Sequence, residues 1–137
     1  MIRPGKQTDI ESILRIDPLS SDPDRQRLVR EAIVTCECFI YEAQEEVVGY
    51  GILHHHFFGR SFIELVVVAE KFQRRGIASS LIRHLEGCSR TVTVFTSTNQ
   101  SNVRMQNLLV KLGYNRSGMI ENLDPGDPEL VYSRSLG

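Results

Sequence analysis

The sequence has almost no net charge, few cysteines and no long apolar segment. It holds 16 basic and 17 acidic side chains among 137 residues, which gives a formal net charge of −1. With this balance the chain as a whole has no excess positive charge that would attract a nucleic acid or an acidic lipid. No apolar run approaches the roughly 20 residues of a membrane-spanning helix, and the opening residues Met1–Lys6 lack the apolar stretch of a signal peptide. We therefore expect a cytoplasmic protein that binds neither nucleic acid nor membrane.

The small number of cysteines excludes two further kinds of small protein. The chain has three cysteines, Cys36, Cys38 and Cys88. An odd number without a CxxC pair argues against a disulfide framework and against a zinc site. Three small apolar side chains in a reducing compartment are the simplest interpretation. Hydrophobic residues make up 41% and charged residues 24%, so the chain can bury a core. Its length suits one domain, residues 1–137.

Hydrophobic periodicity predicts short strands that alternate with helices. A strand at Ile2-Arg3 precedes a helix that begins at the capping-box residues Thr8 and Glu11, and a second helix begins at Asp22-Pro23. Three strands joined by short turns then form an antiparallel meander, at 36–43, 47–57 and 61–69. The later elements are a helix at 76–88, a strand at 91–96, a helix at 101–112 ended by Gly113, and strands at about 114–121 and 129–134. This order predicts a mixed sheet with helices packed on it.

The most informative segment joins a valine-rich strand to a helix through the loop Gln73-Arg74-Arg75-Gly76. The first N–H groups of a helix have no partner within the helix and carry the positive end of its dipole. Gly76 and Ala78 leave the backbone open to close approach, and the two arginines add positive charge. The pattern is typical of a phosphate or pyrophosphate site; a solvated basic turn is the alternative. Neither GxxxxGK[ST] nor GxGxxG occurs, so the segment is neither a P-loop nor a dinucleotide fingerprint.

The stretch Gln73-Arg74-Arg75-Gly76-Ile77-Ala78 resembles the acyl-CoA signature Q/R-x-x-G-x-G/A of the GNAT superfamily of N-acetyltransferases. The stretch from Asn102 to Leu112-Gly113-Tyr114 resembles the family's second landmark, N-x-x-A-x-x-L-Y-x-x-x-G-F. The resemblance covers nearly the whole chain. It implies an α+β, GNAT-like single domain with a central, mostly antiparallel sheet of six or seven strands, about four flanking helices, and a splayed strand pair that binds acyl-CoA.

The resemblance also implies where acetyl-CoA, the cosubstrate, binds. The backbone of the splayed strand would pair with the pantetheine arm, a role that falls on Val66, Val67 and Val68. Asn102 would hydrogen-bond that arm or the strand end beside it. The pyrophosphate would lie on the start of the helix, mainly on backbone N–H groups, at Arg74, Arg75, Gly76, Ile77, Ala78 and Ser79. No metal is implied.

Members of this family transfer an acetyl group directly from acetyl-CoA to an amine in a ternary complex. Glu64 is our candidate for the catalytic base because it lies two residues before Val66, on the same face of one strand. Its apolar sequence neighbours predict lost solvation and a raised pKa, whereas an ordinary half-exposed strand glutamate is the alternative. The N–H of Val66 is the candidate donor to the developing oxyanion.

Two positions depart from the family pattern. Leu109 stands where many members have a general-acid tyrosine, and Ser97 stands where some have a base glutamate. We expect Tyr114 in the core, and Tyr50 or Tyr132 is left as a possible proton donor. The departures keep open a catalytically weak or inactive CoA-binding module that acts as a sensor or partner domain. A third alternative is a nucleotide- or phosphate-binding domain outside this family.

The acceptor amine is not specified by the sequence. In the family its pocket is formed by the first two helices and by the late strand connections, here 17–30 and 121–129. The second stretch has acids that would favour a cationic amine, unless they belong to a solvated turn: Glu121, Asp124, Asp127 and Glu129. A small amine, a polyamine or aminoglycoside-like compound and a protein amine all fit.

Histidines add a second feature near the expected acceptor pocket. On a strand, His54 and His56 share one face while His55 points away. The pattern favours a role in lining that pocket over metal binding, since no third ligand lies nearby. The late strands could pair across a homodimer.

Overall fold

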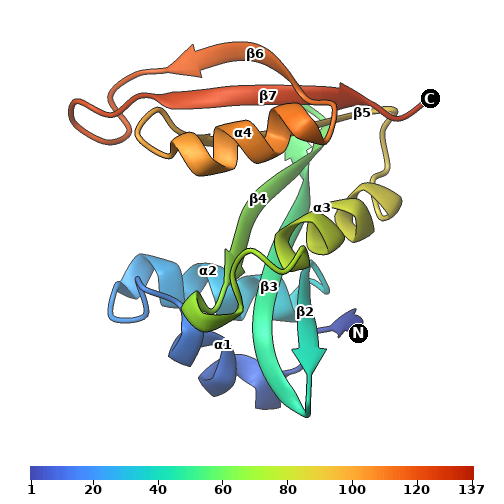
Figure 1. Cartoon of the computed structure of the whole chain (residues 1–137), viewed down its shortest axis with the longest axis vertical. Coiled ribbons are helices and arrows are strands. Elements are labelled where there is room, and N and C mark those ends of the chain that lie inside the picture. Colours follow the sequence, from blue (N-terminus) through green and yellow to red (C-terminus); the bar gives the residue numbers. More distant parts are fainter. The chain divides into compact units, whose positions relative to one another are not determined.

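The computed structural model describes all 137 residues, and its elements follow the predicted order (Figure 1). The strands are β1 (Ile2–Pro4), β2 (Cys38–Ala43), β3 (Glu46–Phe57), β4 (Arg60–Val68), β5 (Thr93–Asn99), β6 (Asn115–Ile120) and β7 (Glu129–Ser135). The α-helices are α1 (Ile10–Ile16), α2 (Pro23–Val34), α3 (Ile77–Gly87) and α4 (Val103–Lys111). Single turns of 3-10 helix, η1 (Gln7–Asp9) and η2 (Glu70–Phe72), precede α1 and α3. None of these helices is long and apolar enough to cross a membrane.

The strands form a seven-stranded sheet in the order β1-β2-β3-β4-β5-β7-β6. Ser61–Ile63 of β4 pair in parallel with Val94–Thr96 of β5, whereas β1–β2, β2–β3, β5–β7 and β6–β7 are antiparallel. The predicted α+β fold with a mostly antiparallel sheet is therefore confirmed. The chain divides into two compact units, residues 1–53 with 65–88 and residues 54–64 with 89–137. The splay of β4 from β5 and the single domain 1–137 stay predictions.

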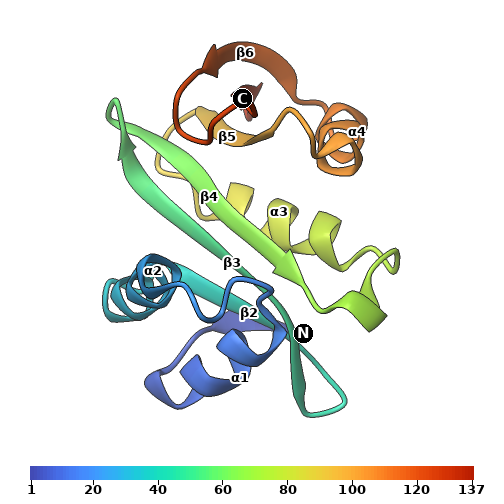
Figure 2. The same cartoon turned by 90° about the vertical axis from the view of Figure 1, so that its left-hand side faces the viewer.

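Helices pack on both faces of the strands in the first unit, as Figure 2 shows for α2 and α3. Leu65 and Val67 of β4 pack with a core cluster that includes Ile13 of α1 and Val29 of α2. The alternate residues Val66 and Val68 pack instead with Ile77 and Leu81 of α3. This alternation is the two-residue period of a strand buried on both faces.

Strand β3 lets α3 approach closely because it presents glycine beneath the helix. A Cβ atom at Gly49 would lie 3.2 Å from Ile77, 3.2 Å from the carbonyl oxygen of Val67 and 3.3 Å from Leu81. A β-bulge accompanies this contact: Tyr41 pairs with Gly49 and Glu42 with Val47, so that Val48 is passed over. Val48 consequently also packs with α3. The bulge and the glycine together set where the first turn of α3 lies.

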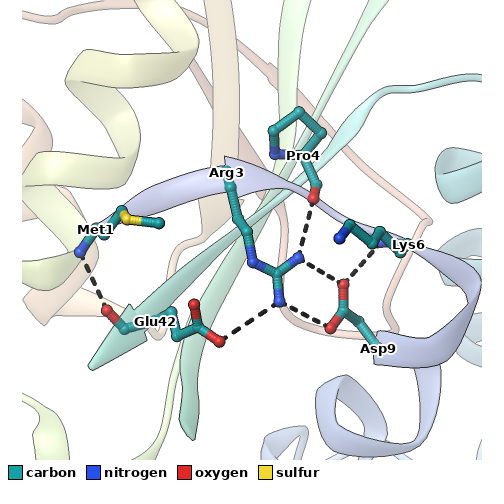
Figure 3. A network of polar contacts seen from close by, with 6 residues as sticks. All are labelled: Met1, Arg3, Pro4, Lys6, Asp9 and Glu42. Atoms are coloured by element: carbon teal, nitrogen blue, oxygen red, sulfur yellow. Dashed lines mark hydrogen bonds and ion pairs between the residues drawn. The ribbon is translucent and has the colours of Figure 1, made fainter. Parts of the chain in front are cut away.

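The start of the first helical segment differs from the prediction. Asp9, rather than Thr8, organises it: Asp9 Oδ2 accepts hydrogen bonds from the backbone N–H of Lys6 and from Arg3 Nη1, both at 2.8 Å (Figure 3). Arg3 also approaches Glu42 at 3.5 Å. The segment begins with the 3-10 turn η1, whose N-cap is Lys6, and Asp9 is the third residue of its capping box. Strand β1 is thereby tied to both η1 and β2. Asp22 caps α2 as predicted, accepting from the N–H of Asp24 at 2.9 Å.

A buried carboxylate holds the connection between α1 and α2 against β3. The side chain of Asp17 has no exposed surface. It accepts from Arg25 Nη1 at 2.9 and 2.8 Å, from the N–H of Leu19 at 2.9 Å, and from the hydroxyl of Tyr50 at 2.5 Å. Burial alone would raise the pKa of Asp17, but these hydrogen bonds outweigh it and lower that pKa below its ordinary value of 3.8.

We predict that Asp17→Asn destabilises the fold by about 2–4 kcal/mol, because it leaves the Arg25 guanidinium without its buried counter-charge. The pKa of Asp17 is lower in the folded than in the unfolded chain. Its contribution is therefore present at neutral pH and is lost as the pH falls below 3.8. Urea denaturation at pH 7 and at pH 3 should show a smaller difference between variant and parent at the lower pH. Asp24→Asn, which breaks only the exposed ion pair with Arg27, is the control and should cost at most about 1 kcal/mol.

The contact between β3 and α3 gives a second prediction. Gly49→Val should destabilise the fold by about 1–3 kcal/mol, because the added side chain meets Ile77 and the backbone of β4. Gly87→Ala is the matched control: a Cβ atom there meets nothing within 4 Å, and alanine stabilises a helix by up to about 1 kcal/mol relative to glycine. Equal unfolding free energies for both variants in urea titrations would contradict the close packing of α3 on β3.

Candidate functional site

The first candidate surface is the N-terminus of α3, in the first unit. Gly76 precedes the helix in the left-handed conformation, with φ 80° and ψ 8°, where glycine is unstrained. The first helical hydrogen bond runs from the N–H of Ser80 to the carbonyl of Gly76 at 3.0 Å, and no side chain caps the helix. The N–H groups of Ile77, Ala78 and Ser79 therefore have no partner within the helix. We call residues 74–79 the anion cradle.

The surroundings of the anion cradle favour an anion. No acidic residue occurs in the first turn of α3, Arg74 and Arg75 are exposed, and a Cβ atom at Gly76 would meet nothing within 4 Å. The Arg75 guanidinium lies 5.0 Å from the ring centroid of Phe72, a cation–π contact. Positive charge, open backbone and the helix dipole thus coincide, and a pyrophosphate group fits their chemistry.

Backbone contacts join the loop before the anion cradle to the sheet. The N–H of Ala69 donates to the carbonyl of Val48 at 2.8 Å, and Gln73 Nε2 donates to the carbonyl of Val68 at 3.2 Å. Val66, Val67 and Val68 lie on β4 immediately before this loop, partly exposed. The structure therefore brings nine of the predicted cosubstrate-binding residues together in the first unit, leaving Asn102 in the second. Asn102 caps α4: its Oδ1 accepts from the N–H of Met105 at 3.1 Å.

A second candidate surface, in the other unit, is a face of the strands with a base of aromatic rings. Phe57 stacks on Phe62 with ring centroids 4.6 Å apart, and lies 5.3 Å from Phe95. Phe62 and Phe95 are partners in the parallel β4–β5 register, so the residues two further along, Glu64 and Ser97, extend from the same face. We call this surface the polar–aromatic face. Its members are His54, His56, Phe57, Phe62, Glu64, Phe95, Ser97 and Glu129.

Glu64 lies beside the histidine pair on this face. Its side chain is 36% exposed, so the desolvation expected from its apolar sequence neighbours is only partial. His54 Nε2 lies 4.0 Å from Glu64 Oε2. The backbone N–H of His56 donates to His54 Nδ1 at 3.2 Å, which leaves the proton of the neutral ring on Nε2, toward Glu64. The rings of His54 and His56 stack at 3.7 Å, which confirms that the two share a face. His55 contacts Ser61 instead, Nδ1 to Oγ at 2.8 Å.

The two positions that depart from the family pattern have different surroundings. Leu109 is 2% exposed and belongs to the core. Ser97 Oγ donates to Glu129 Oε2 at 2.6 Å, so a carboxylate from β7 lies at this position of β5. Sequence analysis placed Glu129 among the acids of a late loop and missed this contact, since only the β5–β7 register joins residues 32 positions apart.

Tyr50 and Tyr132, the two tyrosines left open by the sequence, are poor candidates for an external acid. Tyr50 is fully buried and its hydroxyl donates to Asp17. Burial, followed by that hydrogen bond, raises the pKa of Tyr50 well above its ordinary value of 10. Tyr132 is 2% exposed. Tyr114, also 2% exposed, lies in the core as predicted.

The acidic stretch 121–129 is largely occupied with local contacts. Asp127 accepts from the N–H and hydroxyl of Ser101 at 3.0 and 2.5 Å, and Asp124 Oδ2 accepts from Asn99 Nδ2 at 2.9 Å. These bonds hold the connection to β7 against the end of β5. No group of three or more His, Cys, Asp or Glu residues is arranged to hold a metal ion.

Comparisons with known proteins bear on the family of the chain. The sequence model of the acetyltransferase (GNAT) family matches residues 8–114, whereas no curated protein matches the chain. The solved structure of a GNAT-family acetyltransferase from Bacillus cereus is 32% identical, covers 98% of this chain and 96% of its own, and has a TM-score of 0.91.

Two more distant structures share the fold. The ribosomal-protein-S18-alanine N-acetyltransferase of Escherichia coli is 16% identical over 100% of this chain and 94% of its own, with a TM-score of 0.82. A Bacillus anthracis protein solved in complex with acetyl coenzyme A is 16% identical over 72% of this chain and 61% of its own, with a TM-score of 0.65. The match of the family model over residues 8–114, which include the anion cradle and Glu64, decides the assignment: the chain belongs to the acetyltransferase (GNAT) family.

Proposed function

We propose that the protein is an N-acetyltransferase that transfers an acetyl group from acetyl-CoA to a primary amine by direct attack in a ternary complex. The observation that carries this proposal is the uncapped, positively charged N-terminus of α3 directly after β4, in a chain of the GNAT family. The pyrophosphate of acetyl-CoA would lie on the N–H groups of the anion cradle, with Arg74 and Arg75 beside it. The backbone of Val66–Val68 and Asn102 would meet the pantetheine arm.

In the proposed reaction the amine nitrogen attacks the thioester carbon, the carbon–sulfur bond breaks, and CoA leaves as a thiolate, which takes up the second proton that the nitrogen loses as the amide forms. An acceptor amine with an ordinary pKa near 10.4 arrives as an ammonium ion and must first lose a proton. Glu64 accepts that proton, directly or through a water molecule. The N–H of Val66 donates to the thioester oxygen as negative charge develops on it. No external acid is assigned, because a thiol with a pKa near 8.5 is a tolerable leaving group.

His54 supports Glu64 in this proposal. With its Nδ1 accepting from the backbone, the neutral ring presents Nε2–H toward the carboxylate 4.0 Å away. A single water molecule or a small rotation of the Glu64 side chain would join the two groups. His54 then orients the base and passes on the proton that Glu64 has taken.

The acceptor and the cellular setting belong to the proposal as well. A small amine, a polyamine and the amino group of a protein are the candidate acceptors. The Escherichia coli relative, whose name gives ribosomal protein S18 as its substrate, adds a peptide with N-terminal alanine to the panel worth testing. Three free cysteines suit the reducing cytoplasm, and a homodimer through the late strands is compatible with the exposed strand β6.

The anion cradle gives a prediction on affinity. The double variant Arg74→Ala, Arg75→Ala should weaken acetyl-CoA binding at least about tenfold in calorimetric titration, the size of one charge-assisted hydrogen bond to a phosphate. Added salt should weaken binding to the parent more than to the variant, since screening acts on these charges. Arg30→Ala, which removes an exposed arginine from α2, is the control. If the double variant and this control bound acetyl-CoA with equal affinity, the assignment of pyrophosphate binding to the anion cradle would be ruled out.

Thiol release from acetyl-CoA with a panel of amines, followed by mass spectrometry of the product, tests the reaction itself. Glu64→Gln should lower kcat/KM at neutral pH about 10²-fold, the lower range for a positioned base. The loss should shrink as the pH rises toward the pKa of the acceptor amine, because less of the acceptor then needs deprotonation. Glu46→Gln, at the exposed start of β3, is the control.

An unchanged pH profile of kcat/KM in the Glu64 variant would rule out Glu64 as the base. Tight acetyl-CoA binding without turnover across the whole panel would instead favour a CoA-binding sensor or partner module. The buried leucine at position 109, where the family's general-acid tyrosine is expected, is the observation that keeps this second function in view.

A further inference from the structure

The contact between Ser97 and Glu129 places a second carboxylate on the polar–aromatic face. Ser97 of β5 pairs with Val131 of β7, and Asn99 pairs with Glu129. The Glu129 side chain therefore reaches back along β5 to receive the Ser97 hydroxyl at 2.6 Å. That bond uses one of the roughly four lone-pair positions of the carboxylate. Both residues are partly exposed, so the remaining positions can accept hydrogen bonds from a ligand.

Glu129 differs in this respect from its acidic neighbours. Asp124 accepts from Asn99 and Asp127 accepts from Ser101, and these bonds fasten the loop before β7. Glu121 lies in the exposed part of that loop. Of the four acids in the stretch, Glu129 is the one whose carboxylate is bonded to a residue of the polar–aromatic face.

The register gives an approximate separation between Glu129 and Glu64. Phe62 is paired with Phe95, so Glu64 and Ser97 are the next residues on the same face of β4 and β5. Glu129 is attached to β7, one strand beyond β5. Strands lie about 4.8 Å apart and rise about 3.3 Å per residue, and Glu129 is paired two residues beyond Ser97, so regular strand spacing gives about 12 Å between the two glutamate backbones. The lean of Glu129 toward Ser97 brings its carboxylate closer.

We propose that Glu129, held by Ser97, binds a second positive charge of the acceptor and so makes the enzyme selective for dicationic amines. This inference rests on the proposed function, with Glu64 as the group that serves the reacting nitrogen. We take a diamine whose nitrogens are separated by four or five carbons as the length that meets both carboxylates. Phe62 and Phe95 lie two residues before Glu64 and Ser97 on this face, on the side away from Glu129, so they border the proposed site and do not fill the space between the two carboxylates.

The test compares amines of equal length with one or two charges. For the parent enzyme, kcat/KM should be about tenfold higher for 1,4-diaminobutane and 1,5-diaminopentane than for butylamine and pentylamine, the effect of one charge-assisted hydrogen bond. Glu129→Gln keeps an acceptor for the Ser97 hydroxyl but removes the charge, and should abolish the preference mainly through KM. Ser97→Ala should reduce the preference in part, and Glu121→Gln should leave it intact. A preference that survives in Glu129→Gln would overturn the inference.

A binding measurement separates this inference from the proposed function. The N,N,N,N′,N′,N′-hexamethyl-1,4-butanediammonium ion cannot be acetylated, because both of its nitrogens are quaternary. In the presence of CoA it should bind the parent about tenfold more tightly than tetramethylammonium does, and Glu129→Gln should lose that difference. This result would support the dicationic site even if no amine were turned over. Equal binding of both ions to the parent would contradict it even if acetyl transfer were found.

Discussion

Close packing of α3 on the glycine positions of β3 is the constraint on which the candidate site depends. Gly49 presents no side chain beneath the helix, and the bulge that passes over Val48 adds a buried valine beside it. Ile77, the first residue of α3, rests on this surface. The backbone N–H groups that follow Gly76 are therefore fixed relative to the end of β4, where Gln73 bonds the carbonyl of Val68. An anion site built from backbone atoms needs this rigidity, because it has few side chains that could adjust.

Strand β4 contributes residues to both compact units. Its last residues, Leu65–Val68, are anchored in the first unit by side chains that alternate between two cores. Glu64, the residue before them, belongs to the second unit and lies beside His54. Under the proposed function, one short strand thus supplies both the backbone for the cosubstrate and the base for the acceptor. The small net charge of the chain is thus a sum that includes a basic anion cradle in one unit and a face with two carboxylates in the other.

Features set by local sequence could be predicted, and features set by distant pairing could not. The element order, the cap at Asp22 and the end of α4 at Gly113 follow from spacing and capping chemistry. The cap at Thr8 was wrong because Asp9 is held by Arg3 across a 3-10 turn. The Asp17–Tyr50 contact joins residues 33 positions apart, and the Ser97–Glu129 contact depends on a register that no single segment encodes. The backbone geometry of the loop 73–79 could be predicted because the left-handed Gly76 and the helix start at Ile77 depend on local sequence.

The central claim is that the anion cradle and the end of β4 together bind acetyl-CoA through its pyrophosphate and its pantetheine arm. The most direct test is a calorimetric titration of the unmodified protein with acetyl-CoA, with acetyl-pantetheine, which lacks the pyrophosphate, and with ATP, which lacks the pantetheine arm. Acetyl-CoA should bind at least about tenfold more tightly than either of the others, since each lacks one of the two contacts. If ATP or acetyl-pantetheine bound as tightly as acetyl-CoA, the account would be contradicted.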